Sequence, residues 1–372
     1  MSEISYVVVF PSVFAKNKIP ALITNIKKIL KIRNQKFNSV KREGSIVIVD
    51  ANDPVFASSA INLLFGIEKI AIARQVSNDF DTLVDEITKL GGNLLLKGEQ
   101  FNVRVEGSPK GYTQKDLEVA ATSSIIEKKS NLGAKPGNDQ NYDKLIYTYV
   151  TKRNAYICIY LDEGHEGIPY GYHKKSALCC IYDELSAVSC LQTIREGFQT
   201  SIIVCYNKRS DLTKLAKILD RILPVTLAEK IPIEFYKLAF KPTSKNYQKL
   251  VGLIIEVLVN VAKTKGFNYV SLPVSPIVFP ISYVEYAMNR FWQENIIPIF
   301  PLGGIGKEVF QSARDLGLEK YLRNIEVVIT KRFGDILKPK KTEVQVCLQT
   351  KNTVQVTIGP NNVHDILDSL EE

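Results

Sequence analysis

The chain has 372 residues, of which 45% are hydrophobic, and a formal net charge of +9. Its length exceeds what one hydrophobic core normally serves, so we expect two or three domains. No apolar run approaches the ~18 residues of a membrane-spanning helix, so we expect neither such a helix nor a membrane partner.

The cysteines argue against a disulfide-stabilised scaffold and against a zinc site. There are six: Cys158, Cys179, Cys180, Cys190, Cys205 and Cys347. Most lie in apolar stretches and none forms a CxxC pair, so we expect buried, reduced thiols in a cytoplasmic protein.

The first element is a predicted strand over residues 5–10. The opening sequence MSEISYVVVF has no basic region and no small-residue cleavage site, so we expect no signal peptide. After Ile19 the pattern predicts an amphipathic helix. Leu22, Ile26 and Ile29 recur at helical spacing, and the lysines between them fall on the opposite side.

The positive charge is concentrated around this helix. Between Pro11 and Arg42 there are nine basic residues and no acidic one, and five of them stand out as candidates: Lys27, Lys28, Lys31, Arg33 and Arg42. A charged stretch is usually a solvated face. A stretch without any counter-charge favours contact with phosphate groups, and therefore with RNA or DNA.

Short strands and helices alternate through the rest of the first half. Strands are predicted over 44–50, 68–76, 101–107, 144–150 and 155–161, and helices over 53–66, 79–91 and 114–129. Residues 130–143 read as a polar loop. The pattern predicts two small α/β modules, at 1–75 and 76–165.

A segment with little periodicity, 162–175, separates this half from a different pattern. Continuous apolar runs at 176–182, 200–206, 267–274 and 294–302 are typical of strands buried on both faces of a parallel sheet. Helices are predicted between them, at 184–197, 210–222, 246–265, 281–293 and 306–317. We therefore predict a doubly wound α/β domain over 170–335. A C-terminal hairpin and tail, with a short acidic helix, follow at 336–372.

Three stretches resemble the tRNA 4-thiouridine sulfurtransferase family. FNVRVEGSPKGYTQKDLEVAATSSIIEK resembles its THUMP domain, HEGIPYGYHKK its Gly-Leu-Pro-x-Gly linker, and PIFPLGGIGKEVFQSARDLGL its Pro-Leu-x-Gly segment. The resemblance covers nearly the whole chain, and it rests on the order in which the three stretches occur. The resemblance implies an N-terminal ferredoxin-like domain, a THUMP domain that grips the 3′ end of tRNA, and a PP-loop ATP pyrophosphatase domain that uses ATP and Mg²⁺.

The sequence departs from this family at the corner between strand 176–182 and the next helix. Family members carry Ser-Gly-Gly-x-Asp-Ser there, where bare glycine backbone approaches the ATP phosphates. This chain has IYDELS, with Tyr182, Asp183, Glu184 and Ser186, and only the serine remains. Asp183 and Glu184 are a possible acid–base pair, but acids that open a helix are more often caps. We interpret the corner as a degenerate phosphate loop.

The sulfur-carrying cysteine of the family is also absent. It is expected near Tyr247 to Leu250, and there is no cysteine between Cys205 and Cys347. Without the loop and the cysteine, we expect no catalytic residue and no cofactor. Three histidines, of which His165 and His173 lie near acidic residues in the linker, are interpreted as solvated, and we expect no metal site.

Two further segments are candidate anion contacts. Arg104, Lys110, Tyr112 and Lys115 lie on or near the THUMP-like loop, where lysine and arginine suit phosphates and tyrosine suits a base. Glu106 opposes them, and a solvated loop is the alternative. Gly303, Gly304, Gly306 and Lys307 form a glycine-rich turn before a helix. This is a weak signal for an anion site, because such turns also cap helices.

Three functions stay open. The leading hypothesis is an RNA-binding protein, built like a tRNA sulfurtransferase, that no longer activates ATP and presents tRNA to a separate enzyme. The second is a working thiolation enzyme with a rearranged site that takes sulfur from a partner. The third is a non-catalytic subunit whose α/β domain mediates assembly.

Overall fold

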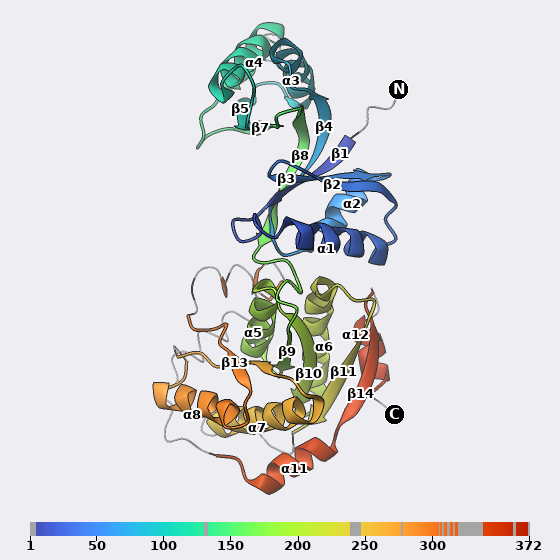
Figure 1. Cartoon of the computed structure of the whole chain (residues 1–372), viewed down its shortest axis with the longest axis vertical. Helices are drawn as coiled ribbons and strands as arrows, with labels where there is room; N and C mark the ends of the chain where they lie inside the picture. The colour runs from blue at the N-terminus through green and yellow to red at the C-terminus, as the bar shows by residue number, and fades with distance from the viewer. Residues whose placement is uncertain are drawn as a thin grey trace. The chain divides into compact units, whose positions relative to one another are not determined.

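The chain folds into two compact units, residues 1–166 and 167–372, in a computed structural model (Figure 1). The structure describes residues 5–129, 133–238, 247–276, 278–304, 338–359 and 362–370, with isolated positions between 306 and 318. The predicted α/β fold class is confirmed, because helices pack beside a mixed β-sheet in each unit. Within the described ranges, no helix is long and apolar enough to span a membrane.

The first unit is built on one sheet of eight strands. The strand order is β2-β3-β1-β4-β8-β7-β5-β6. The elements are β1 (Ser5–Pro11), α1 (Ile19–Ile32), β2 (Phe37–Glu43), β3 (Ile46–Ala51), α2 (Pro54–Ile61), β4 (Ile67–Ser77), α3 (Phe80–Leu94), β5 (Gln100–Gly107), α4 (Gln114–Lys128), β6 (Lys135–Pro136), β7 (Lys144–Val150) and β8 (Asn154–Glu166).

Strands β4 and β8 make this sheet continuous. They pair along their length, from Ile67 opposite Glu166 to Ser77 opposite Asn154. The boundary predicted at residue 75 therefore lies inside β4, and the division into two modules stays a prediction. Strand β2 was not predicted from the sequence. Only Val40 is buried in it, so its sequence lacks the alternation of apolar residues that marks a strand.

The second unit is a sheet of six strands in the order β13-β12-β9-β10-β11-β14. Its elements are β9 (Ser176–Ile181), α5 (Glu184–Arg195), β10 (Gln199–Tyr206), α6 (Arg209–Ile222), the 3₁₀ turn η2 (Leu223–Thr226), β11 (Lys230–Lys237), α7 (Tyr247–Lys265), β12 (Tyr269–Ser271), α8 (Ile281–Trp292), β13 (Ile297–Ile299), α11 (Lys341–Gln349), β14 (Asn352–Thr357) and α12 (Asn362–Asp368). All pairs are parallel except β11 with β14. From β9 the next strands along the chain, β10 and β11, are added on one side of the sheet, and β12 and β13 are added on the other side of β9, as in a doubly wound sheet.

The predicted C-terminal hairpin is wrong. Residues 341–349 form helix α11, and β14 instead joins the edge of the main sheet beside β11. The run VQVCLQ alternates like a strand, but a helix buries Val344 and Cys347, which are three residues apart, and leaves Val346 exposed. The side chain of Glu343 also accepts a hydrogen bond from the backbone of Lys340, which stabilises the helix start.

Candidate nucleic-acid interface

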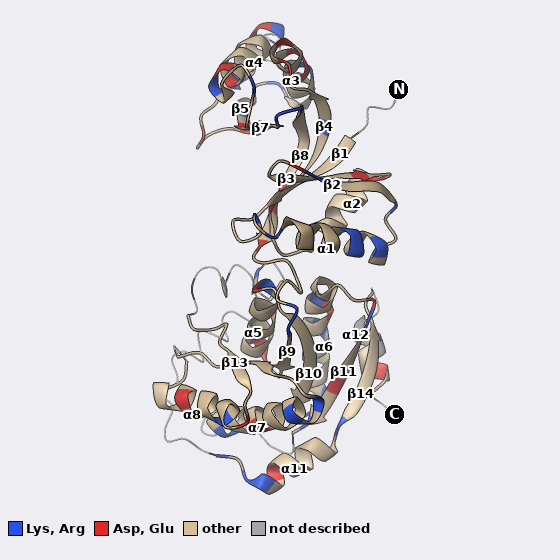
Figure 2. Cartoon of the chain, viewed as in Figure 1, with Lys and Arg blue, Asp and Glu red and all other residues tan. Residues whose placement is uncertain are grey.

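Helix α1 presents the predicted basic face. Leu22, Ile26 and Ile29 are buried in the unit, whereas the side chains of Lys27 and Lys28 are exposed. Lys31 is exposed one turn further on, so the spacing places the three lysines on one side of the helix end. Figure 2 shows the basic residues of α1 in blue toward one end of the helix. Arg33 caps this end of the helix and is only partly exposed.

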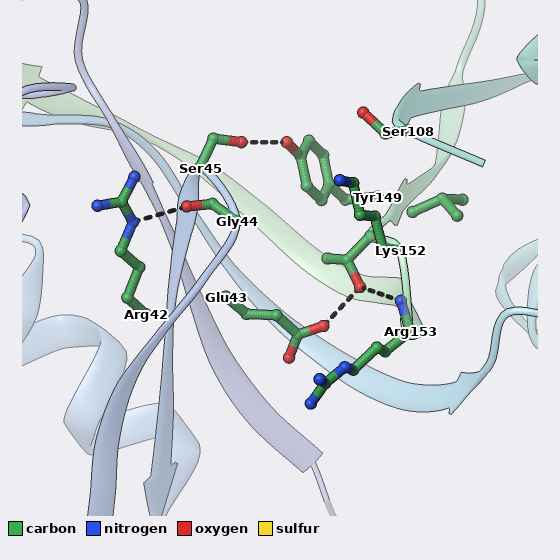
Figure 3. A pocket seen from close by; sticks show the side chains of 10 residues that line it. Arg42, Glu43, Gly44, Ser45, Ser108, Tyr149, Lys152 and Arg153 are labelled. Atoms are coloured by element: carbon green, nitrogen blue, oxygen red, sulfur yellow. Dashed lines mark hydrogen bonds between the residues drawn. The ribbon is translucent and has the colours of Figure 1, made fainter. Parts of the chain in front are cut away.

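A basic pocket lies between the β2–β3 hairpin and the β7–β8 turn (Figure 3). Its volume is about 420 Å³. It is lined by Arg42, Glu43, Gly44 and Ser45 of the hairpin, by Ser108, and by Tyr149, Val150, Thr151, Lys152 and Arg153 of the turn. Three residues with cationic side chains and four with hydroxyls, together with Glu43, thus line one small space. Cationic groups and hydroxyls are the combination that binds phosphate oxygens.

Glu43 holds the two sides of this pocket together. Its carboxylate accepts hydrogen bonds from Thr151 Oγ1 at 2.5 Å, from Asn154 Nδ2 at 3.1 Å and from Tyr156 OH at 2.6 Å. Burial alone would raise the pKa of Glu43, but these hydrogen bonds outweigh burial and lower the pKa below its usual value. The carboxylate is therefore ionised at neutral pH, and its oxygens accept from the turn residue Thr151 and from the start of β8.

Further contacts fix the rim of the pocket. The hydroxyls of Ser45 and Tyr149 lie 2.6 Å apart, and Arg42 Nε donates to the carbonyl oxygen of Gly44 at 2.8 Å. Gly107 has a φ of +106°, and a Cβ there would overlap the carbonyl oxygen of Val150. Only glycine at this position admits the close approach that brings Ser108 to the rim.

Substituting Glu43 by glutamine is expected to lower the unfolding free energy by about 1 kcal/mol at pH 7, because charge-assisted hydrogen bonds become neutral ones. The depressed pKa makes this contribution present above the unfolded-state pKa and lost as pH falls through the folded-state pKa. Urea unfolding at several pH values, with hydrogen exchange in residues 151–156, measures both effects. A Glu43→Gln protein with the same acid sensitivity as the wild type would contradict this account.

The other residues predicted to contact RNA are divided between two further hollows. Arg104 and Lys115 line a groove of about 500 Å³ between β5 and α4. Arg104 lies 3.5 Å from Glu106, and Lys115 lies 3.3 Å from Glu118. These acids offset the positive charge, so the groove suits phosphate less well than the basic pocket does.

Lys110 and Tyr112 line a shallow site that also contains Asp79 and Asp116. The Tyr112 ring lies edge-on to Phe80, at 5.2 Å between centroids, and its hydroxyl donates to Asn78. The tyrosine is thus held by contacts within the unit. Stacking of Tyr112 on a base stays a prediction.

In the second unit, the predicted phosphate-loop corner is filled by its own side chains. Asp183 is the N-cap of α5, and its Oδ1 accepts from the backbone N–H of Ser186 at 2.8 Å. Ser186 Oγ accepts from the backbone N–H groups of Tyr182 and Asp183, each at 2.9 Å. Tyr247 at the start of α7 donates its hydroxyl to Asp183 Oδ2 at 2.7 Å. Three backbone amides at this corner, those of Tyr182, Asp183 and Ser186, are therefore already bonded to side chains.

Two acidic side chains, Asp183 and Glu184, lie at this corner. Burial raises the pKa of Asp183, while the hydrogen bonds from Ser186 and Tyr247 act in the opposite direction. Glu184 is buried and forms an ion pair with Lys214. The two acids thus act as a cap and as an ion-pair partner.

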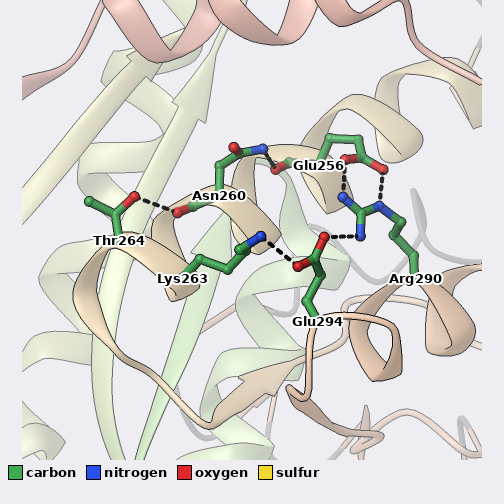
Figure 4. Close-up of polar contacts among 6 residues, drawn as sticks. All are labelled: Glu256, Asn260, Lys263, Thr264, Arg290 and Glu294. Atoms are coloured by element: carbon green, nitrogen blue, oxygen red, sulfur yellow. Dashed lines mark hydrogen bonds and ion pairs between the residues drawn. The ribbon is translucent and has the colours of Figure 1, made fainter.

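Helix α7, which supplies Tyr247, is tied from its middle onward to α8 and to the residues that follow α8 (Figure 4). Arg290 binds Glu256 in a bidentate manner, with distances of 2.7 and 3.0 Å, and also reaches Glu294 at 2.9 Å. Lys263 adds a contact to Glu294 at 2.5 Å. These ion pairs position the helix independently of the corner.

The remaining predicted sites are weaker. Gly303, Gly304 and Gly306 are in the structure, but Lys307 lies outside the described residues, so the glycine-rich anion site stays a prediction. All six cysteines are free and buried. Over the described ranges, no group of histidine, cysteine and acidic residues has the arrangement of a metal site.

Sequence reasoning missed most of the basic pocket. It identified Arg42, but not Lys152, Arg153 or Tyr149, which the fold brings opposite the hairpin. The available signal was the basic turn TKRN between two apolar strands.

Comparison with known proteins gives relatives among tRNA sulfurtransferases. The chain is 22% identical over 186 residues to a probable tRNA sulfurtransferase of Methanosarcina mazei, and 22% identical over 188 residues to one of Methanosarcina acetivorans. The matches cover 50% of this chain and 46% and 45% of those proteins, so the chain spans about half the length of the curated relatives it matches. No family model matches the sequence.

Solved structures share the fold. PH1313 from Pyrococcus horikoshii Ot3 has a TM-score of 0.63 and 16% identity, over 84% of this chain and 99% of that chain. A 4-thiouridine synthetase in complex with RNA and bound ATP has a TM-score of 0.65 and 14% identity, over 100% of this chain and 98% of that chain. The chain is therefore similar to tRNA sulfurtransferases in sequence, and its fold is that of these structures.

Proposed function

We propose that this chain, which is similar to tRNA sulfurtransferases, binds tRNA or another structured RNA with its first unit. The observation that carries the proposal is the basic pocket, where Arg42, Lys152 and Arg153 share a small hydroxyl-lined space. The exposed lysines of α1 extend the positive charge of the same unit. Such groups contact the sugar–phosphate backbone and position an RNA.

The proposal includes the loss of ATP activation at the start of α5. A bound triphosphate needs unpaired backbone amides and an approach free of negative charge. Here the side chains of Ser186 and Asp183 occupy three of the amides at the corner, and Asp183 adds a carboxyl group at the helix start. The residues at this corner therefore do not fit ATP and Mg²⁺, which supports an RNA carrier that presents tRNA to a separate modifying enzyme.

The free, buried cysteines support a reducing compartment, and we place the protein in the cytoplasm. A working thiolation enzyme with a rearranged site, and a non-catalytic assembly subunit, are the alternatives.

Two measurements on the purified full chain separate these functions. Filter binding to tRNA is expected to show an affinity that falls steeply with salt, with a logarithmic slope of about −5 if about six phosphates are contacted. ATP–pyrophosphate exchange and tRNA-dependent AMP formation are expected to be absent. Exchange activity would instead support the working thiolation enzyme. Failure to bind tRNA at low salt would leave the non-catalytic assembly subunit as the remaining hypothesis.

A further inference from the structure

A row of four aromatic side chains lies at the amino ends of the strands in the second unit. The ring centroids of Tyr172 and His173 are 5.5 Å apart, those of His173 and Phe198 are 4.9 Å apart, and those of Phe198 and Tyr269 are 5.9 Å apart. The rings come from the linker before β9, from the residue before β10 and from the first residue of β12. Because β9 pairs with both β10 and β12, the fold brings three distant segments together.

These rings are not part of the hydrophobic core. Tyr172 is 41% exposed, His173 is exposed, and Phe198 and Tyr269 are partly exposed. A hydrogen-bond contact of 2.9 Å between His173 Nε2 and the carbonyl oxygen of Glu196 fixes the orientation of the imidazole. The row is thus a fixed aromatic surface that is partly open to solvent.

Two lysines border the row. Lys175 Nζ lies 4.7 Å from the centroid of the Tyr269 ring and donates to its hydroxyl at 2.6 Å. The side chain of Lys174 is exposed, and its backbone has a φ of +54°. This left-handed conformation suits glycine or asparagine better than lysine, and such strain is commonly found at functional positions.

We propose that this aromatic row is a second contact for single-stranded RNA, with an unpaired base stacked at Tyr172 and His173 and the adjoining phosphates at Lys174 and Lys175. Aromatic rings beside cationic side chains are the usual means of holding unpaired nucleotides, since every base has a face that can stack. The lysines favour a polyanion over an apolar protein surface. The proposal rests on the proposed RNA-binding function and names a contact separate from the first unit.

The row also lies apart from the closed corner at Asp183. That corner follows the carboxyl end of β9, whereas the rings are at the amino ends of the strands. RNA contact at the row is therefore compatible with a filled phosphate-loop corner, and it needs no ATP.

The test compares binding of a labelled oligouridylate with binding of a blunt-ended, fully paired RNA duplex, using full-length variants. Tyr172→Ala is expected to weaken oligouridylate binding on the order of tenfold and to leave duplex binding unchanged, because bases within a paired helix are not free to stack on the ring. Tyr172→Trp keeps a ring and should retain binding. Trp292→Ala, which removes another exposed aromatic side chain of the same unit, should have no effect.

Lys174→Asn distinguishes RNA contact from a structural role. It removes the charge but suits the left-handed backbone, so it should weaken oligouridylate binding without lowering the melting temperature. Equal affinities for Tyr172→Ala and Trp292→Ala, or unchanged oligouridylate binding by Lys174→Asn, would overturn the proposal. A wild type that binds tRNA but shows those results refutes only the aromatic row, whereas a wild type that binds no RNA refutes the proposed function itself.

Discussion

Replacing Lys27, Lys28 and Lys31 together with alanine is expected to weaken tRNA binding on the order of tenfold and to reduce the salt slope by about 3. The three side chains are exposed on one side of α1, and each phosphate contact releases condensed counterions from the RNA. The fold should tolerate the change, since alanine is a good helix former and the buried side of α1 is untouched. Filter binding over a range of salt concentrations measures both quantities.

A matched control removes the same amount of charge elsewhere. Lys208, Lys217 and Lys230 are exposed in the second unit, and replacing them with alanine should change tRNA affinity less than twofold, by about 0.4 kcal/mol or less. If both triple variants lose affinity equally, the effect is one of net charge. In that case the placement of the RNA surface on α1 is wrong.

The basic face of α1 was predictable because helix periodicity is local. Leu22, Ile26 and Ile29 alone define the buried side, and the lysines between them must then face solvent. The basic pocket is different. Its two sides are about a hundred residues apart in sequence, and they meet only because β4 and β8 pair along one continuous sheet. No local pattern contains that pairing.

At the THUMP-like loop, residues that are close in sequence do not form one surface in the structure. Arg104, Lys115 and Tyr112 are close in sequence, yet the fold places Tyr112 in a different hollow from Arg104 and Lys115 and gives each of the three a partner. Arg104 is on a strand whose side chains alternate between faces, and Lys115 is in the first turn of a helix. Closeness along the chain therefore predicted a common surface that the structure divides between two hollows.

The cap at Asp183 was predictable only in part. An acid before a helix predicts a cap from sequence alone, and the structure has that cap. The contact with Tyr247 was not predictable, because it depends on where α7 begins relative to β9. That contact turns an ordinary cap into a closed corner.

Substituting Asp183 by alanine is expected to lower the unfolding free energy of the second unit by about 2 kcal/mol. Loss of the cap accounts for about 1 kcal/mol, and the partly buried Tyr247 hydroxyl, left without its acceptor, for about another 1 kcal/mol. Trp292 is the single tryptophan of the chain and lies in this unit, so its fluorescence during urea unfolding reports the change. Asp53→Ala, which removes the exposed cap of α2 in the first unit, provides the reference for losing a cap alone, with its unfolding followed by circular dichroism because Trp292 lies in the other unit.

The pH dependence gives a second, independent check. Burial raises the pKa of Asp183 in the folded state, so its favourable contribution is complete below the unfolded-state pKa and declines as pH rises through the folded-state pKa. Asp183→Asn keeps an acceptor but does not ionise, so the stability of the wild type relative to Asp183→Asn should fall with rising pH. If Asp183→Ala loses no more stability than Asp53→Ala, then Tyr247 does not close the corner. The argument against ATP activation would then rest only on the bonded amides of Tyr182, Asp183 and Ser186.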